Sequence, residues 1–406
     1  MSLPFAFQTL TSSPLWASAF RPFYLLGALY APVLVAAWLA AWLGGWPPPS
    51  AALPLKVLHG HEFIYGFSAA IITGIVLTAL PSWAGTEEIR GPPLVLLVAL
   101  WLAGRVSFWA SPWLPLLAPA LVDCLLFPAL FVMLAPQLLG AANRLYLLLL
   151  PILLALFGAN LLYHHGIVTA NPTQAWLALR LSIYSLIVLY VLKGGVLTPI
   201  FTGNALRASG RGEQARFDMR LEVVAVGAVL LLAVLDLTAA PPAWTGAAAL
   251  ACALVHGWRG ARWQGWRVAD VPLVLVMHLG FAWLVATFAL KAAAELTGGV
   301  PEAAWLHAFT VGSLGMMMLG LMTRVSLRHT GRPLVVPPAM LMAYGMMFLA
   351  ALLRLAAAIP GLGNAAIALS ATLWGTSFLL YFLAFRKLLV APSAPRSPGP
   401  SLQSGT

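Results

Sequence analysis

Residues 145–165 read LYLLLLPILLALFGANLLYHH and contain no aspartate, glutamate, lysine or arginine. At about 1.5 Å per residue, a helix of this length spans about 30 Å, the thickness of the hydrocarbon core of a bilayer. Comparable apolar runs recur along the whole chain. The pattern predicts an all-α fold, a polytopic membrane bundle of about twelve transmembrane helices.

The composition excludes a water-soluble domain. Of the 406 residues, 61% are hydrophobic and 8% are charged, and the mean hydropathy is +0.92. The net charge of +11 comes from basic residues in short interhelical loops, so membrane topology explains it and we expect no nucleic-acid partner. Cys124 and Cys252 belong to no CxxC pattern, which argues against disulfides and against a cysteine-rich metal site.

The apolar runs define twelve predicted spans. They are residues 22–43, 57–80, 93–110, 114–137, 145–165, 175–200, 220–239, 243–257, 271–292, 303–325, 334–358 and 364–389. We expect residues 1–390 to form one integral membrane domain and residues 391–406 to form a disordered cytoplasmic tail. No sequence repeat relates the two halves, which weakens an inverted-repeat transporter interpretation.

The basic residues set the expected orientation. They follow even-numbered spans, as with Arg211 after the sixth, Arg262 after the eighth and Arg332 after the tenth. The odd-numbered loops offer little beyond Lys56 and Lys291. The positive-inside rule therefore predicts that both termini are cytoplasmic.

Histidines are the clearest candidates for chemistry. Five of the eight fall near the predicted periplasmic face, namely His59, His61, His164, His165 and His307. Imidazole is the commonest metal ligand and serves both haem iron and copper. In a regular helix His59 and His61 point about 200° apart, so we expect them to serve different metals, or one to support the other's site.

A structural interpretation competes with the metal-binding one. A histidine at a helix end can simply hydrogen-bond headgroups or backbone, and we prefer this interpretation for His256. His278 lies inside an apolar span, where ionisable groups usually face a site or a cavity. Methionines 316–318 and 322 could bind copper(I), although such runs more often fill gaps between helices.

Buried charges form a further group of candidates. Glu62 follows His61 and could orient an imidazole or carry protons. Asp123, Arg105, Lys193 and Arg354 are expected to pair between helices.

Five motifs occur in a distinctive order. They are Phe20-Arg21-Pro22-Phe23, His59-Gly60-His61-Glu62, the run from His278 to Leu284, the run from Leu306 to Gly312, and the run from Thr323 to Arg332. This ordered set resembles the NnrS family of haem- and copper-containing membrane proteins, from about residue 16 to residue 390.

The resemblance implies a multi-pass protein of the bacterial cytoplasmic (inner) membrane, linked to nitric oxide metabolism and nitrosative-stress defence. The histidines in its motifs become the candidate metal ligands: His59, His61, His278, His307 and His329. The motif arginines become candidate cofactor-binding residues: Arg21, Arg324, Arg328 and Arg332. His164 and His165 correspond to a less distinctive region. Val196 stands where the family pattern typically carries an arginine. If that arginine neutralises a haem propionate, then Arg324, Arg328 or another basic residue must do so here, or the cofactor differs.

The leading hypothesis is a redox protein whose histidines hold haem b, with copper as a further metal, and whose centre binds or reduces nitric oxide. Reduction of nitric oxide to nitrous oxide consumes two molecules, two electrons and two protons. Glu62 and Tyr65 are therefore candidate proton carriers, and an electron donor that the sequence does not identify is required. The alternatives are a metal-handling protein or transporter without redox turnover, and a haem protein that binds or senses nitric oxide without catalysis.

Overall fold

The computed structural model describes residues 12–46, 53–141 and 144–395. Within these ranges the chain is entirely helical and forms no strand, which confirms the predicted fold class. Residues 396–406 of the predicted tail lie outside the described ranges. Buried side chains from Ala19 to Leu389 form one connected hydrophobic cluster.

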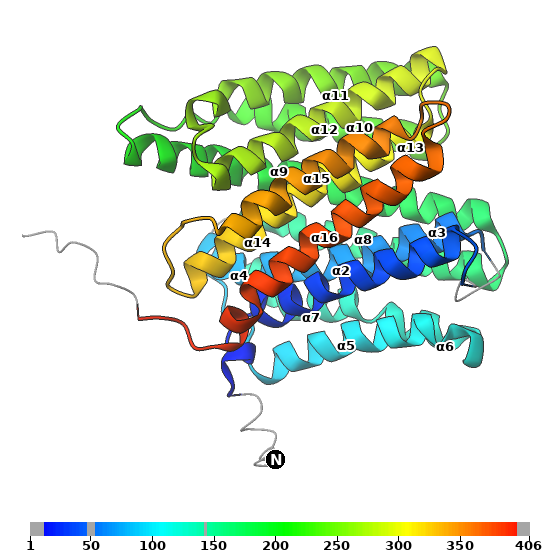
Figure 1. The fold of residues 1–406 in the computed structure, drawn as a ribbon, viewed down its shortest axis with the longest axis horizontal. Helices are drawn as coiled ribbons and strands as arrows, with labels where there is room; N and C mark the ends of the chain where they lie inside the picture. Colours follow the sequence, from blue (N-terminus) through cyan, green and yellow to red (C-terminus); the bar gives the residue numbers. More distant parts are fainter. Residues whose placement is uncertain (1–11, 47–52, 142–143, 396–406) are drawn as a thin grey trace, which may run out of the picture.

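Twelve long helices make up the bundle (Figure 1). The first six are α2 (Phe20–Trp42), α3–η2–α4 (Leu55–Ala84), α5 (Pro92–Trp109), α6–α7 (Leu117–Gly140), η4–α8 (Arg144–Val168) and α9 (Pro172–Ala208). The next six are α10 (Met219–Leu237), α11 (Pro242–Arg262), α12 (Pro272–Thr297), α13–η6–α14 (Glu302–His329), α15 (Pro338–Ala356) and α16 (Gly363–Val390).

Ten of the twelve helices are long and apolar enough to cross a membrane, which makes this a multi-pass membrane protein. The other two are α10 and α11. Helix α10 carries Arg220, Glu222 and Asp236, and α11 carries Arg259 and Arg262. They are neighbours, and α11 also packs along α12.

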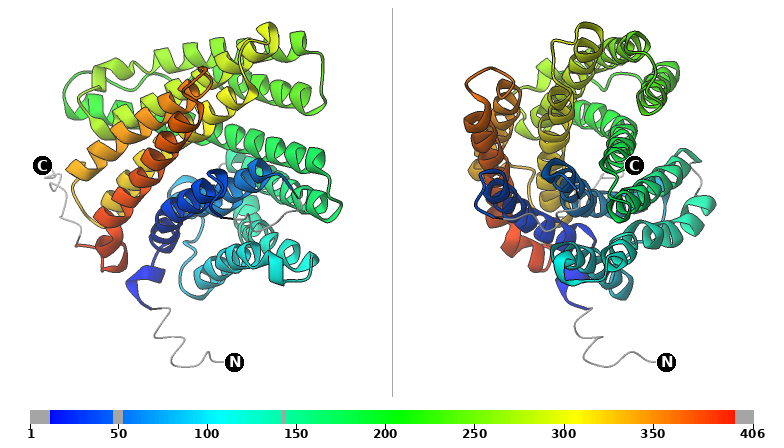
Figure 2. Two further views of the ribbon diagram at one scale, coloured as in Figure 1. Left: turned by 45° about the vertical axis from the view of Figure 1, so that its right-hand side comes forward. Right: turned by 90° about the vertical axis from the view of Figure 1, so that its right-hand side faces the viewer.

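The helices form a bundle with two flanks. Helices α10, α11 and α12 lie at the top of Figures 1 and 2, and α5 and α6 lie at the bottom. The first and last long helices, α2 and α16, pack along each other. Arg21 joins their ends, because Nη1 donates to the carbonyl oxygens of Leu389 at 2.9 Å and Ala391 at 2.7 Å. The chain therefore enters and leaves the bundle at the same end.

Two helices contain a π-helical segment in the first half of their span. These segments are η2 (Glu62–Ser68) and η6 (Ala308–Leu314), and each directly follows a histidine. A π segment inserts an extra residue into the helical register and commonly marks a functional site. In both helices it redirects the side chains that follow the histidine.

The two π-containing helices share a residue pattern. His61, Phe63, Gly66, Gly74 and Gly85 correspond to His307, Phe309, Gly312, Gly320 and Gly331, each pair separated by 246 positions, as in 307 minus 61. Gly85 and Gly331 both adopt a positive φ, 69° and 74°, where each helix ends. The helices run in the same direction in Figure 1, so this similarity is not an inverted repeat.

Candidate metal centre

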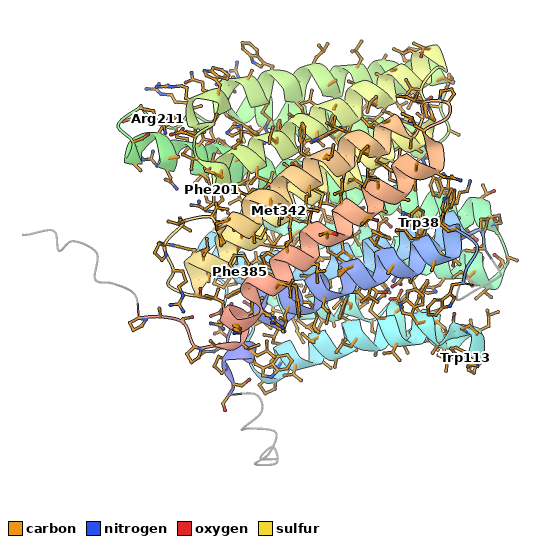
Figure 3. All side chains as sticks on the ribbon, in the orientation of Figure 1. Trp38, Trp113, Phe201, Arg211, Met342 and Phe385 are labelled. Carbon is orange, nitrogen blue, oxygen red and sulfur yellow. The ribbon has the colours of Figure 1, made fainter. Side chains whose placement is uncertain are left out.

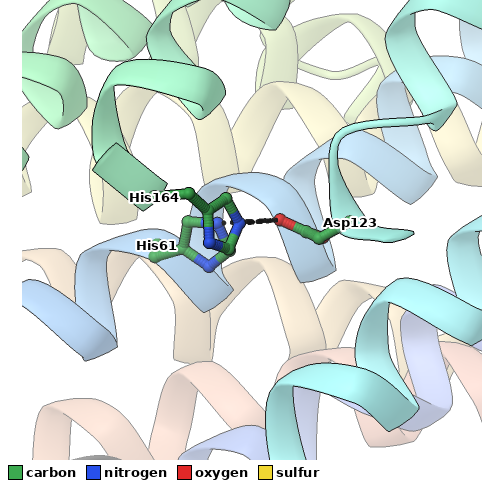
Figure 4. Close-up of side chains that lie close together, drawn as sticks. All are labelled: His61, Asp123 and His164. Atoms are coloured by element: carbon green, nitrogen blue, oxygen red, sulfur yellow. Dashed lines mark hydrogen bonds and ion pairs between the residues drawn. The ribbon is translucent and has the colours of Figure 1, made fainter. Parts of the chain in front are cut away.

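Three buried side chains from three helices meet in the half of the bundle that includes α5 and α8. They are His61 at the end of α3, Asp123 at the end of α6, and His164 on α8. Figure 4 shows both imidazole rings against the Asp123 carboxylate. His164 Nε2 lies 2.9 Å from Asp123 Oδ2, and His61 Nε2 lies 3.1 Å from the same oxygen. One ligand atom from each residue falls within 4.8 Å of the others, so the group could hold a metal ion.

Local structure brings Asp123 to this position. The helix breaks between α6 and α7, which leaves Asp123 at the end of a seven-residue helix. Gly104 on α5 permits the close approach, because a Cβ at that position would lie 2.9 Å from Asp123 Oδ1. A larger residue at position 104 would push the carboxylate away from the two imidazoles.

Aromatic rings fix the His61 ring. Its centroid lies 4.1 Å from that of Tyr163, 4.9 Å from that of Tyr65 and 5.5 Å from that of Phe108, all in stacked arrangements. Glu62 Oε1 lies 3.2 Å from His61 Nδ1. A carboxylate that accepts a hydrogen bond from Nδ1 leaves the Nε2 lone pair for a metal, as is usual for metal-binding histidines.

Arginine and asparagine complete a buried polar network around the three residues. The Arg105 guanidinium forms ion pairs with both Glu62 and Asp123. Asn160 Nδ2 donates to Asp123 Oδ2 at 2.9 Å, and its Oδ1 lies 2.9 Å from His61 Nε2. Tyr30 donates a hydrogen bond to the Glu62 carboxylate.

The charges of this network do not balance. Two ionised carboxylates face one guanidinium, so the cluster carries one net negative charge while both imidazoles are neutral. An uncompensated charge at this depth is costly, because little water is present to solvate it. One further positive charge, from a bound cation or from a proton on a histidine, would neutralise the cluster.

The donor atoms narrow the choice of cation. Two imidazoles and a carboxylate suit divalent zinc, iron or copper(II), whereas copper(I) prefers sulfur ligands. With metal–ligand distances of about 2.0–2.1 Å, tetrahedral ligands lie about 3.3 Å apart. The present distances of 2.9 and 3.1 Å need only a small expansion. Three protein ligands would leave a position open to an external ligand.

A cavity of about 380 Å³ lies on the other side of the same helix. His59 on α3 and His307 at the end of α13 both line it, as does Arg354 on α15. His59 and His61 thus face different sites, in agreement with their expected angular separation. Trp38, which also lines the cavity, lies in Figure 3 toward the end of the bundle opposite Arg211.

The model of the NnrS protein family matches residues 14–393 of this chain. The chain belongs to the NnrS family. None of the curated proteins matches it. The match covers every long helix, so the buried histidine–aspartate–histidine group and the cavity both lie within the matched part of the chain.

The histidines of the NnrS motifs fall in four separate places. His61 joins the metal group, and His59 and His307 share the cavity. His278 Nε2 lies 2.8 Å from the Thr202 hydroxyl, between α12 and α9. His329 packs beside Phe20 at the end of α14, with ring centroids 5.8 Å apart. Their roles as metal ligands stay predictions.

The motif arginines lie near the end of the bundle where α2 begins and α14 ends, and none of them lines the cavity. Arg21 is engaged by the end of α16, and Arg324 stacks on Phe201 with 3.7 Å between the guanidinium carbon and the ring centroid. Arg328 and Arg332 are exposed.

The two predicted proton carriers both contact His61, Glu62 through its carboxylate and Tyr65 through its ring. Glu62 contacts both His61 and Arg105. The Tyr65 hydroxyl donates to the Leu156 carbonyl at 2.9 Å and lies 2.6 Å from Ser182 Oγ.

By predicted depth, His164 was among the five candidate histidines near the periplasmic face, but the motif resemblance left it out of the candidate ligands. Asn160 was given no role, and Asp123 was recognised only as a buried charge. The predicted depth pointed to His164, because it lies at the end of the fifth predicted span. His61 lies near the start of the second predicted span, on the same membrane face. The interpretation of His256 as an interfacial residue is wrong. Its side chain is fully buried and stacks on Phe288 at 5.3 Å, because that face of α11 packs against α12.

Proposed function

We propose that this NnrS-family protein is a haem b- and metal-binding protein of the bacterial cytoplasmic membrane that binds nitric oxide in nitrosative-stress defence. The supporting observation is the buried His61–Asp123–His164 group, whose donor atoms and unbalanced charge both suit a metal cation. The haem and nitric oxide parts of the proposal come from the motif resemblance to the family.

The reductase form of the proposal assigns distinct tasks to the residues of the chain. A bound metal centre would supply an open coordination position and electrons received from an external donor. The ionised Glu62 carboxylate, which contacts Tyr30 and His61, would accept a proton and pass it on. A small cavity of about 30 Å³ is lined by both Glu62 and His59, which is enough room for one water molecule. Such a water would connect Glu62 to the larger cavity. Tyr65 would extend the hydrogen-bond network toward Ser182, whose Oγ its hydroxyl contacts.

The first experiment measures cofactor content. Protein produced at low oxygen with haem and copper supplied should contain haem b by the pyridine haemochrome assay and at least one further metal by elemental analysis. Absence of both would contradict the proposal. A metal-handling protein or transporter would contain exchangeable metal but no haem.

The second experiment separates binding from turnover. Nitric oxide should change the absorption spectrum of the reduced protein. Its consumption should then be followed with an electrode in the presence of several electron donors and a boiled control. Binding without consumption above that control would restrict the function to nitric oxide binding or sensing.

A further inference from the structure

We infer that haem occupies the cavity between α3 and α13, with His59 and His307 as its axial ligands and Lys56 and Arg354 beside its carboxylates. This inference rests on the haem of the proposed function and assigns its ligands and its orientation. It concerns a site separate from the His61–Asp123–His164 group.

The shape and lining of the cavity suit a flat, largely apolar group. Its volume of about 380 Å³ lies in the range of small-molecule and cofactor sites. The walls are mostly apolar and include Trp38, Phe63, Phe67 and Trp374. Aromatic walls of this kind offer wide contact surfaces to a planar macrocycle.

His307 is prepared to act as a ligand. Its Nδ1 donates to the Ala303 carbonyl oxygen at 2.7 Å, one turn earlier in α13. This hydrogen bond selects the tautomer in which Nε2 carries the lone pair, and it fixes the orientation of the ring. The ring lies on the wall of the cavity, so an available donor nitrogen lines the proposed site.

His59 lines the same cavity as His307. Its ring is held against Trp38 and Phe63, with centroids 4.6 and 4.3 Å away. Its Nδ1 is buried and has no hydrogen-bond partner among the described residues, and the same is true of Trp38 Nε1. Both imidazoles line this one cavity. Two polar groups without partners on an apolar wall indicate a missing ligand.

Cations collect at one end of this cavity. Lys56 and Arg354 both line it, together with the single carboxylate of Glu302. Arg354 lines the cavity together with both imidazoles and forms no ion pair within the described part of the chain. Glu302 lies 3.8 Å from Arg180. This end therefore carries a net positive charge, which suits the two carboxylates of a haem. Arg324 and Arg328 do not line the cavity, so they would neutralise those carboxylates less directly.

Ligand substitutions test the axial pair. Wild-type protein should show the low-spin spectrum of haem with two histidine ligands. His59→Met and His307→Met should each convert it to a histidine–methionine spectrum with a higher reduction potential. His59→Gly and His307→Gly should bind haem at least about tenfold more weakly, and added imidazole should restore the low-spin spectrum. His165→Ala, which changes an exposed histidine, is the matched control.

The outcomes separate this inference from the proposed function. Wild-type protein without haem would contradict the proposed function itself. Wild-type protein that contains haem, with unchanged spectra in the His59 and His307 variants, would overturn only the ligand assignment. Restoration by imidazole would show that a glycine variant is folded.

Charge substitutions test the orientation of the haem. Arg354→Gln should release haem to apomyoglobin about tenfold faster, the size expected for loss of one charge-assisted hydrogen bond. Arg386→Gln, which changes an exposed arginine at the other end of the bundle, is the control. Equal release rates in the two variants would contradict the placement of the carboxylates at Arg354.

Discussion

Asp123 is the residue on which the proposed metal centre most depends. Its Oδ2 is the atom shared by His61, His164 and Asn160. Asp123→Asn removes the charged ligand while it keeps the size of the side chain. We expect at least about a tenfold loss of metal affinity, measured by elemental analysis of protein dialysed against a metal buffer.

Asp236→Asn is the matched control for this substitution. Asp236 is also a buried aspartate, but its partners are Lys291 and Arg180 rather than histidines. We expect this variant to retain its metal. Equal metal loss in both variants would mean that general destabilisation, not ligand removal, explains the result for Asp123.

Arg105 is predicted to contribute strongly to stability. Arg105→Met would leave two buried carboxylates, Glu62 and Asp123, without their cation. Breaking such a pair from one side costs about 3–5 kcal/mol of unfolding free energy. Thermal unfolding in detergent should therefore begin at a clearly lower temperature. Arg211→Met, which breaks the exposed pair with Asp270, should leave the transition unchanged.

The sequence alone could identify most members of the site but not their grouping. Glu62 and Asp123 stand out because carboxylates are rare at membrane depth, and the histidines stand out for the same reason. The contact between Asp123 and His164 depends on how α6 and α8 pack, which hydropathy does not encode. The motif resemblance favoured His278 and His329 over His164, although neither lies near His61.

At the scale of elements, the π segment η2 connects the two sites. Gly66 lies within it, and a Cβ there would approach Tyr30, Glu62 and Arg105 at 2.8, 2.9 and 3.2 Å. Gly66→Ala should therefore displace the Glu62–Arg105 pair, lower the unfolding temperature and reduce metal content.

Gly227→Ala provides the control for this helix substitution. A Cβ at Gly227, on α10, meets no atom within 4 Å. The change should be neutral or raise stability by up to about 1 kcal/mol, because alanine is the better helix former. An equal fall in the unfolding temperature of both variants would contradict the requirement for glycine at position 66.

The long helices were predictable, but their irregular segments were not. Runs of apolar residues specify where the chain crosses the membrane, and the predicted spans agree with the helices to within several residues in most cases. A π segment differs from an α-helix by one inserted residue, and local composition does not reveal it. The shared pattern of the two π-containing helices becomes visible only after the structure aligns them.

At the scale of the whole molecule, the bundle has two chemically different ends. Arg211, Arg267, Arg332 and Arg386 lie at the end where the chain enters and leaves. The opposite end contains the start of α3 and of α13, with Lys56, Glu302 and Arg354 at the cavity. If the first end is cytoplasmic, as the positive-inside rule predicts, then the cavity opens toward the periplasmic side.

Reporter fusions test this orientation. Green fluorescent protein folds in the cytoplasm, so a fusion after Ser393 should be fluorescent, and alkaline phosphatase at the same point should be inactive. Alkaline phosphatase inserted between Gly298 and Gly299, in the loop between α12 and α13, should be active because that loop is predicted to be periplasmic. An insertion between Gly210 and Arg211 should be inactive and serves as the internal control. The reverse pattern would place the His59–His307 cavity toward the cytoplasm.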